Sequence, residues 1–209
     1  MKKQFLCFKT AINTGIKYSR IDVVGVRDIG GNLSGDIETI SIEVKRGSAP
    51  FATACGQALG YKIYANRVYL ADYRKDNFSY EEIFIASNLG IGLIQIIDGK
   101  CQEVLTSPFY HPMPDLNLLI LEKLTLGKCQ ICGSFFETGD IKHVFSNLSK
   151  ENLKKAIKDK KGMMFWNYEV ADRKHRLGIK PTPDGTTYER RFICSECIEI
   201  FFSQTVDKK

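Results

Sequence analysis

The spacing of apolar residues in the first part of the chain changes between strand-like and helical. Residues 20–28 and 38–45 are rich in β-branched residues, and the segment 30–36 between them holds glycine, asparagine and aspartate, which are typical of turns. This pattern predicts an antiparallel hairpin. Before it, apolar residues at helical spacing predict a helix over 1–13.

The pattern continues as an alternation of helices and short strands. Pro50 opens an alanine- and glycine-rich helix that is expected to reach residue 65, and 68–71 reads as a short buried strand. Ser79 is a good N-cap for a further helix, because glutamates follow it in the first turn, and 91–97 reads as another strand. This order predicts a mixed α/β domain.

Three prolines between 108 and 114 break the pattern and mark the best domain boundary. An apolar helix is expected over 115–126, a basic helix over 150–161, and a stretch poor in strands before the end of the chain. The predicted organisation is a first domain over 1–106, a connecting segment and helix over 107–127, and a C-terminal domain over 128–209.

Composition and charge narrow the class of protein. The chain has 209 residues, of which 44% are hydrophobic and 26% charged, as in ordinary globular domains. The net charge of +6 is uneven: residues 128–209 hold 16 Lys and Arg against 11 Asp and Glu, whereas 1–127 hold 14 against 13. This asymmetry is compatible with a C-terminal half that binds a polyanion, and equally with a solvated basic face.

The apolar runs favour a protein without a membrane segment. The longest, at 83–97, contains Ser87, Asn88 and Gln95 and is shorter than the roughly 20 residues of a membrane helix. Lys9 ends the apolar run near the N-terminus after a few residues, so no signal peptide is predicted. We therefore expect a cytoplasmic protein with no membrane partner.

Four of the seven cysteines form two Cys-x-x-Cys pairs, which are Cys129 with Cys132 and Cys194 with Cys197. Two such turns can complete a closed tetrahedral zinc site, so we expect structural Zn²⁺ in a small zinc-ribbon-like C-terminal domain that clamps a 61-residue insert. His143 or His175 replacing a cysteine, and two redox dithiols, are the alternatives. The other three cysteines, Cys7, Cys55 and Cys101, are expected to be buried thiols.

The insert between the two pairs mixes basic and aromatic residues, a combination suited to phosphate contact and base stacking. Its candidate nucleic-acid-binding residues are Lys154, Lys155, Lys158, Trp166, Arg173, Lys174, Arg176, Arg190 and Arg191. The alternative is a solvated basic helix beside a small aromatic core.

Charged residues in the predicted hairpin suggest a second metal site. Side chains alternate across a strand, so Glu43 and Lys45 share one face while their apolar neighbours share the other. Asp22 in the partner strand lies on a face with Val24 and needs a partner for its charge. Asp22 and Glu43 together offer the hard oxygen ligands that Mg²⁺ prefers.

These residues resemble the active-site signature of the PD-(D/E)XK nuclease superfamily. Asp22 precedes Glu43-Val44-Lys45 by 21 positions, and a Gln-x-x-x-Tyr motif, Gln57 to Tyr61, follows on the next helix, as in the RecB-type branch. Four positions apart, Gln57 and Tyr61 share a helix face. The resemblance covers about residues 1–106 and implies a restriction-endonuclease-like mixed sheet flanked by helices.

The resemblance also implies roles. Asp22, Glu43 and the Val44 carbonyl would bind catalytic Mg²⁺ or Mn²⁺, Lys45 would assist the attacking water, and Gln57 and Tyr61 would support the site. The expected function is phosphodiester hydrolysis, with DNA as the expected partner, and because many members are dimers a homodimer stays open. The first fifteen residues contain no acidic residue, which argues against a second catalytic metal.

Other interpretations of the same residues stay open. Glu43 and Lys45 can be an ordinary charge pair at a strand edge, and Asp22 can form a salt bridge with Arg20 or Arg46. The corresponding alternative functions are a non-catalytic nucleic-acid-binding protein with a degenerate nuclease fold, and a zinc-stabilised protein-interaction module. Asp28 and Asp36 are rival metal carboxylates, although turn positions favour a structural role for them.

Overall fold

The computed structural model divides the chain into two compact units, Met1–Leu124 and Thr125–Lys209. The structure describes residues 9–16, 18–29, 37–47, 50–129, 131–138, 144–145, 151, 154–155, 158, 163–167 and 189–200. The predicted connecting segment, 107–127, belongs mostly to the first unit: Tyr110 N–H donates to Asn66 O at 2.7 Å and Met113 N–H to Ile63 O at 3.0 Å.

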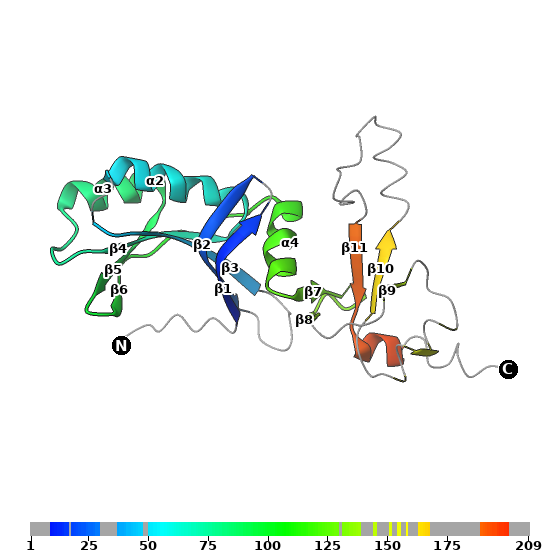
Figure 1. The fold of residues 1–209 in the computed structure, drawn as a ribbon. Helices are drawn as coiled ribbons and strands as arrows, with labels where there is room; N and C mark the ends of the chain where they lie inside the picture. Colours follow the sequence, from blue (N-terminus) through cyan, green and yellow to red (C-terminus); the bar gives the residue numbers. More distant parts are fainter. Residues whose placement is uncertain are drawn as a thin grey trace, which may run out of the picture. The chain divides into compact units, whose positions relative to one another are not determined.

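The first unit is a mixed α/β structure around a six-stranded sheet in the order β1-β2-β3-β4-β5-β6 (Figure 1). Its strands are β1 (Lys9–Ile16), β2 (Ser19–Asp28), β3 (Ile37–Lys45), β4 (Arg67–Tyr73), β5 (Gly92–Ile97) and β6 (Lys100–Leu105). β1, β2 and β3 form an antiparallel meander, β4 and β5 run parallel to β3, and β6 returns antiparallel at the edge.

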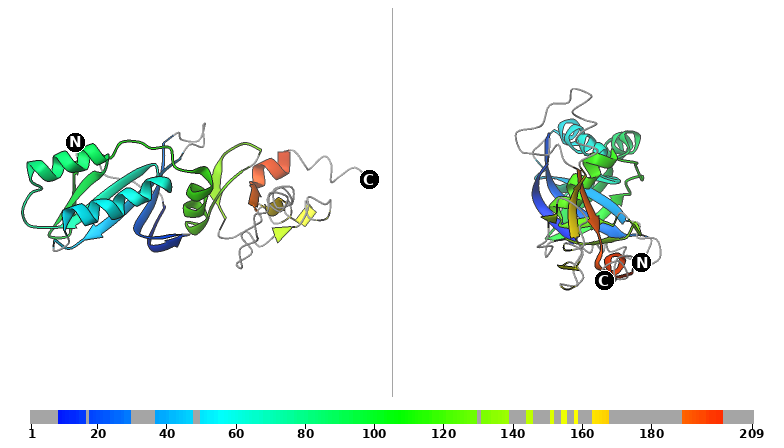
Figure 2. Two further views of the ribbon diagram at one scale, coloured as in Figure 1. Left: turned by 90° about the horizontal axis from the view of Figure 1, so that it is seen from above. Right: turned by 90° about the vertical axis from the view of Figure 1, so that its right-hand side faces the viewer.

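Helices cover the sheet as the parallel connections require. α2 (Phe51–Gly60) continues into a 3₁₀ turn, η1 (Tyr61–Ile63), and links β3 to β4, while α3 (Tyr80–Leu89) links β4 to β5. Both helices lie on one face of the sheet, a layer also visible from above in Figure 2. α4 (Pro114–Lys123) ends the unit.

Local sequence signals fix the ends of α3. Ser79 Oγ accepts a hydrogen bond from Glu82 N–H, and the Glu82 carboxylate accepts one from Ser79 N–H at 2.7 Å, forming a capping box. Gly90 ends the helix in the left-handed conformation, with φ of 65°, which glycine adopts without strain. The predicted helix start after Ser79 is therefore confirmed.

Three expectations for secondary structure are wrong. β1 occupies Lys9–Ile16, where a helix was expected to continue to residue 13; the apolar residues there pair with β2 across the sheet. β6 was not predicted, because its first three residues are exposed, its last three are only half-buried, and the apolar signal is weak. The predicted helix at 115–126 ends at Lys123, and residues 1–8 lie outside the described residues.

The second unit contains more strands than the sequence predicted. β7 (Leu126–Lys128) pairs with β8 (Phe135–Glu137), and β9 (Val144–Phe145), β10 (Met163–Asn167) and β11 (Glu189–Ile193) form a three-stranded sheet. The stretch around Pro181 and Pro183 lies outside the described residues. Of the predicted basic helix, the described residues Lys154, Lys155 and Lys158 have helical backbone and exposed side chains.

The two faces of the six-stranded sheet are both buried, but by different residues. Val24, Leu70 and Leu93 belong to the face beneath α2 and α3, where Ala54, Cys55 and Ala58 approach from the helix. The opposite face forms a cluster of Ile40, Tyr69, Ala71, Ile94 and Ile96. β3 therefore lies in the interior, and a charged residue on either of its faces needs a partner.

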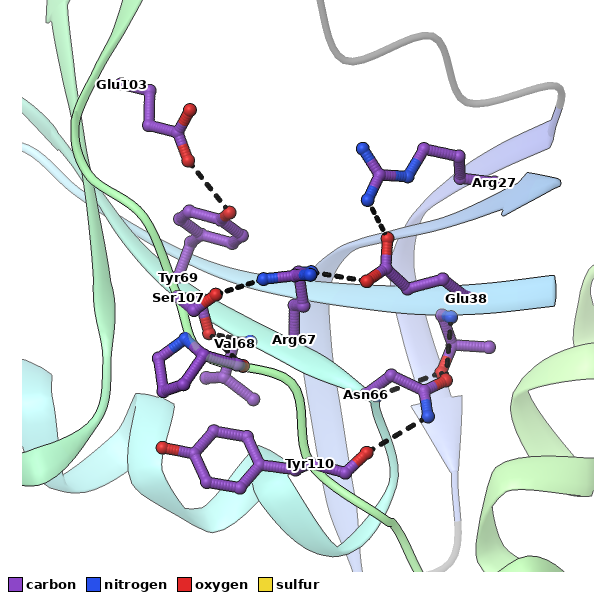
Figure 3. Close-up of polar contacts among 11 residues, drawn as sticks. Arg27, Glu38, Asn66, Arg67, Val68, Tyr69, Glu103, Ser107 and Tyr110 are labelled. Atoms are coloured by element: carbon purple, nitrogen blue, oxygen red, sulfur yellow. Dashed lines mark hydrogen bonds and ion pairs between the residues drawn. The ribbon is translucent and has the colours of Figure 1, made fainter. Parts of the chain in front are cut away.

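Glu38 is such a residue on the face opposite α2. It is 1% exposed, and its carboxylate forms ion pairs with Arg27 on β2 and Arg67 on β4 (Figure 3). Arg67 also donates to the carbonyl of Ser107, whose hydroxyl accepts from Val68 N–H at 3.0 Å. One buried carboxylate thus joins β2, β3, β4 and the segment after β6.

Replacing Glu38 by glutamine should destabilise the first unit, because Arg27 and Arg67 would lose the buried charge that compensates them. Both arginines are partly solvated, at 33% and 21% exposure, so we expect a loss of about 2–3 kcal/mol rather than more. Urea unfolding measures it. Glu81→Gln, at an exposed position in the first turn of α3, is the control and should lower stability much less than Glu38→Gln; equal effects would contradict the assignment.

Candidate metal and nuclease site

Asp22 and Glu43 come together where the β2–β3 ladder ends. The ladder runs to the pair Val23 and Ile42. Beyond that pair, the Asp22 carboxylate accepts a hydrogen bond from Val44 N–H at 2.8 Å, in place of a backbone carbonyl. Because Val24 lies opposite Ser41, the alternation of side chains puts Asp22 on the same face as Glu43, beneath α2.

Glu43 is buried, at 4% exposure, and both of its carboxylate oxygens have a donor. Lys45 Nζ lies 2.5 Å from Oε1, and the Tyr61 hydroxyl lies 2.5 Å from Oε2. The Lys45 ammonium group therefore compensates the charge of Glu43, and the Tyr61 phenol donates a hydrogen bond to its second oxygen. The structure thus brings Glu43, Lys45 and Tyr61 into contact, with Asp22 on the same face of the sheet.

Tyr61 begins the 3₁₀ turn after α2, which brings its ring under the helix and into the interior. Its hydroxyl also lies 3.0 Å from the carbonyl oxygen of Arg20, next to the start of β2. Burial and the hydrogen bond with Glu43 raise the pKa of Tyr61 well above that of a free phenol. The hydroxyl therefore keeps its proton and acts as a donor.

Gln57 lies apart from this group. It is exposed on α2, and among the described residues no polar contact joins it to Asp22, Glu43 or Lys45. Gln57 and Tyr61 are four positions apart, but α2 ends between them at Gly60 and the chain continues as a 3₁₀ turn. The shared helix face that the spacing predicted is consequently lost.

The donor set fits a magnesium ion by its chemistry. Two carboxylates from neighbouring strands share one face, and Mg²⁺ is commonly held by one or two carboxylates together with water and substrate oxygens. The carbonyl predicted as a further ligand belongs to Val44, the residue whose N–H already binds Asp22. Asp22, Glu43 and Val44 are thus the residues that would hold the ion.

Two further polar residues share this face of the sheet and were missed in the sequence. Lys45 lies opposite Asp72 on β4, and Asp72 lies opposite Gln95 on β5. Asp72 accepts a hydrogen bond from Gly47 N–H at 2.7 Å, which ties the end of β4 to the chain that leaves β3. No local signal identifies Asp72, because its position beside Lys45 depends on the parallel pairing of distant strands.

The four paired cysteines form a second cluster, in the second unit. Their Sγ atoms all lie within 4.8 Å of one another, and Cys132 Sγ is 3.8 Å from Cys194 Sγ. A tetrahedral zinc ion with Zn–S bonds of about 2.3 Å separates its sulfur ligands by about 3.8 Å. The predicted set of four cysteines therefore has the geometry of a structural metal such as zinc.

The chain around the cluster explains how the two pairs meet. Cys129 follows β7 and lies beside Phe192 of β11 in a bridge, so the residues that carry the two pairs are neighbours. Cys129 N–H donates to Ser134 O at 2.8 Å and Gly133 N–H to Cys129 O at 3.0 Å, which closes a tight turn around the first pair. Cys197 lies in a helical segment at 195–200.

The thiols of the cluster differ in acidity. Burial acts to raise the pKa of Cys132, but hydrogen bonds with Ser134, Cys129 and Cys197 outweigh it and lower that pKa to about 6. Burial raises the pKa of Cys194 to about 11 and that of Cys197 above the range of a free thiol. Four thiolates in this space need a cation, and a bound dication supplies the charge.

The candidate nucleic-acid-binding residues are only partly described. Lys154, Lys155 and Lys158 are exposed. The antiparallel pairing of β10 and β11 puts Trp166 opposite Arg190 and Phe165 opposite Arg191. Arg173, Lys174 and Arg176 lie outside the described residues.

Among the residues that are described, no helix is long and apolar enough to cross a membrane.

Comparison with known proteins does not identify a family or a function for this chain. No family model matches the chain, and neither does any curated protein. Among solved structures, the chain is similar to a Silicibacter pomeroyi protein of unknown function, with 21% identity over 55% of this chain and 70% of that one, and a TM-score of 0.41. A likeness at this level says nothing about activity.

The cysteine cluster should bind one zinc ion per chain in protein purified without chelator, as measured by elemental analysis. Cys197→Ser removes one of four ligands and should lower the zinc content to well below half an ion per chain, with loss of thermal stability. Cys101 was expected to be buried but is exposed, at the edge strand β6 and outside the cluster, so Cys101→Ser should leave the zinc content unchanged. A wild-type protein without zinc would contradict the site.

The Tyr61 hydrogen bond should contribute to stability in a pH-dependent way. Tyr61→Phe leaves a buried oxygen of Glu43 without a donor and should lower the free energy of unfolding by about 1–3 kcal/mol. Because the pKa of Tyr61 is raised in the folded state, this difference should be constant below about pH 10, where the unfolded phenol begins to ionise, and shrink above it. Urea unfolding of both proteins between pH 7 and 11 tests this.

Proposed function

We propose that this protein is a metal-dependent nuclease that hydrolyses phosphodiester bonds, with DNA as its substrate. The observation that carries the proposal is the convergence of Asp22, Glu43, Lys45 and Tyr61 at one end of the β2–β3 pair. Two carboxylates for a divalent ion and an ammonium group beside them are the side chains that this reaction needs.

The order of the elements supports the same proposal. Three antiparallel strands, β1 to β3, are followed by α2 and by β4, which runs parallel to β3. The resemblance to the PD-(D/E)XK superfamily implies a core order of helix, three-stranded meander, helix and strand. The meander, the second helix and the last strand have counterparts here, while residues 1–8, ahead of β1, lie outside the described residues. The mixed sheet carries Asp22 on the second strand and Glu43 with Lys45 on the third, as that signature requires.

Each residue has a distinct task in the proposed mechanism. Asp22 and Glu43, with the Val44 carbonyl, would hold the divalent ion, which when bound would acidify a water and neutralise charge on the phosphodiester. Lys45 orients the attacking water or stabilises the negative charge that develops on the phosphate. Tyr61 acts on Glu43: its hydrogen bond fixes the carboxylate, and its contact with Arg20 O ties Glu43 to the strand that carries Asp22.

The second unit has a supporting role in this proposal. Four cysteine ligands close a tetrahedral site, which leaves no position for a substrate, so the zinc is structural. It brings together the two ends of a long basic insert, whose exposed lysines would grip or select the nucleic acid. The chain thus separates the residues that cut from the residues that hold the substrate.

Replacing Lys45 by alanine should lower the cleavage rate of DNA in Mg²⁺ at least about a hundredfold, because charge on the phosphate in the transition state loses its partner. Linear, circular and single-stranded DNA are incubated with each protein in Mg²⁺, in Mn²⁺ and in EDTA. Lys100→Ala, at an exposed position on β6, is the matched control and should cleave like the wild type.

The same assay discriminates between the alternatives. Wild-type protein that retains DNA in a gel shift without cutting it, and whose binding is unchanged by Glu43→Ala, would support a non-catalytic nucleic-acid-binding protein. Absence of any salt-sensitive DNA affinity would instead favour a protein-interaction module, since phosphate binding weakens as salt rises.

A further inference from the structure

A cavity of 410 Å³ lies beside Lys45, at the carboxyl ends of β3 and β4. Its volume is within the range of small-molecule sites, about 300–1,000 Å³. The carboxyl ends of strands in open α/β sheets are also where ligands commonly bind. The position and size together indicate a binding site.

The charges of the lining exclude a polyanion as the preferred occupant. Three basic residues line the cavity, Lys45, Arg74 and Lys75, and three acidic residues oppose them, Asp72, Asp76 and Glu82. The charge of Arg74 is already compensated, because its guanidinium donates two hydrogen bonds to the Glu82 carboxylate, at 2.9 and 3.0 Å. A neutral ligand with hydrogen-bonding edges fits this lining better than phosphate.

The remaining walls are apolar and ordered. Phe51, Ala54 and Leu70 line the cavity, and the Phe51 ring packs edge-on against Phe78 with centroids 6.3 Å apart. The Arg74 guanidinium in turn lies over the Phe78 ring, 4.4 Å from the ring centre. Aromatic and guanidinium planes that are held in place are the surfaces on which nucleobases stack, while carboxylates accept hydrogen bonds from base amino groups.

Lys45 connects this cavity to the proposed cleavage site. It lines the cavity and also contacts Glu43, so a phosphate held at Lys45 has the nucleoside attached to it within reach of the cavity. We propose that the cavity binds the base of a nucleotide next to the scissile phosphate. This inference rests on the proposed nuclease function and adds a substrate class to it.

The consequence concerns the state of the nucleic acid. A base stacked and paired in a duplex cannot enter a cavity in the protein unless it leaves the stack, which costs free energy. A single strand, or an unpaired position in a duplex, does not bear that cost in full. The cavity therefore selects single-stranded or locally unpaired substrates over continuous duplex.

The test uses the wild-type protein and a labelled single-stranded oligonucleotide in Mg²⁺, in which one abasic residue is moved along the strand. An abasic residue beside a given bond should lower kcat/KM for that bond about tenfold or more, and one placed three or more nucleotides away should change it less than twofold. The same oligonucleotide annealed to its complement should be cut more slowly.

A pair of variants tests the cavity from the side of the protein. Ala54→Leu fills it from α2, whereas Ala52→Leu adds the same atoms at an exposed position of the same helix. Ala54→Leu should raise KM for the intact strand about tenfold and remove its sensitivity to the adjacent abasic residue, and Ala52→Leu should behave as wild type. A thermal melt shows whether Ala54→Leu is folded, and the abasic series does not depend on it.

The outcomes separate the two proposals. Cleavage that is equally sensitive to an abasic residue at every position, or faster on the duplex, would overturn the cavity as a base site and leave the nuclease standing. A wild-type protein that cuts no strand in any metal would contradict the nuclease and, with it, the base site.

Discussion

The cost of burying negative charge in β3 organises the first unit. This strand carries Glu38 near its beginning and Glu43 near its end, with exposures of 1% and 4%. An ionised carboxylate without a partner is strongly destabilising in such surroundings. Because odd and even positions of a strand face opposite sides, the two carboxylates need separate sets of partners, and each set ties β3 to its neighbours.

The two sets differ in a way that matters for function. Glu38 is held by Arg27 and Arg67, two guanidinium groups that stay charged and come from the strands on either side (Figure 3). Glu43 is held by an ammonium group and a phenol, each through a single hydrogen bond. The first arrangement suits permanent structure. In the proposed mechanism the second would open to admit a divalent ion, next to the carboxylate of Asp22.

The proposed site thus depends on positions that the sheet sets. The β2–β3 pairing brings Asp22 to Val44, the turn after α2 brings Tyr61 to Glu43, and the parallel pairing of β3 with β4 sets Asp72 beside Lys45 at the edge of the cavity. In the second unit the equivalent constraint is the cysteine cluster, which brings together two cysteine pairs that are separated by 61 residues of the chain. Both sites join segments that are distant in sequence.

Local chemistry in the sequence determined a good part of this protein. The hairpin of β2 and β3, the capping box of Ser79 and the two Cys-x-x-Cys pairs follow from alternation, capping and spacing, which act within a few residues. Only the tertiary structure made Lys9–Ile16 a strand, separated Gln57 from the carboxylates, and joined Glu38 to its arginines. Strand pairing decided the first and the last of these features, because it joins segments whose partners no local pattern identifies. The end of α2 at Gly60 decided the position of Gln57.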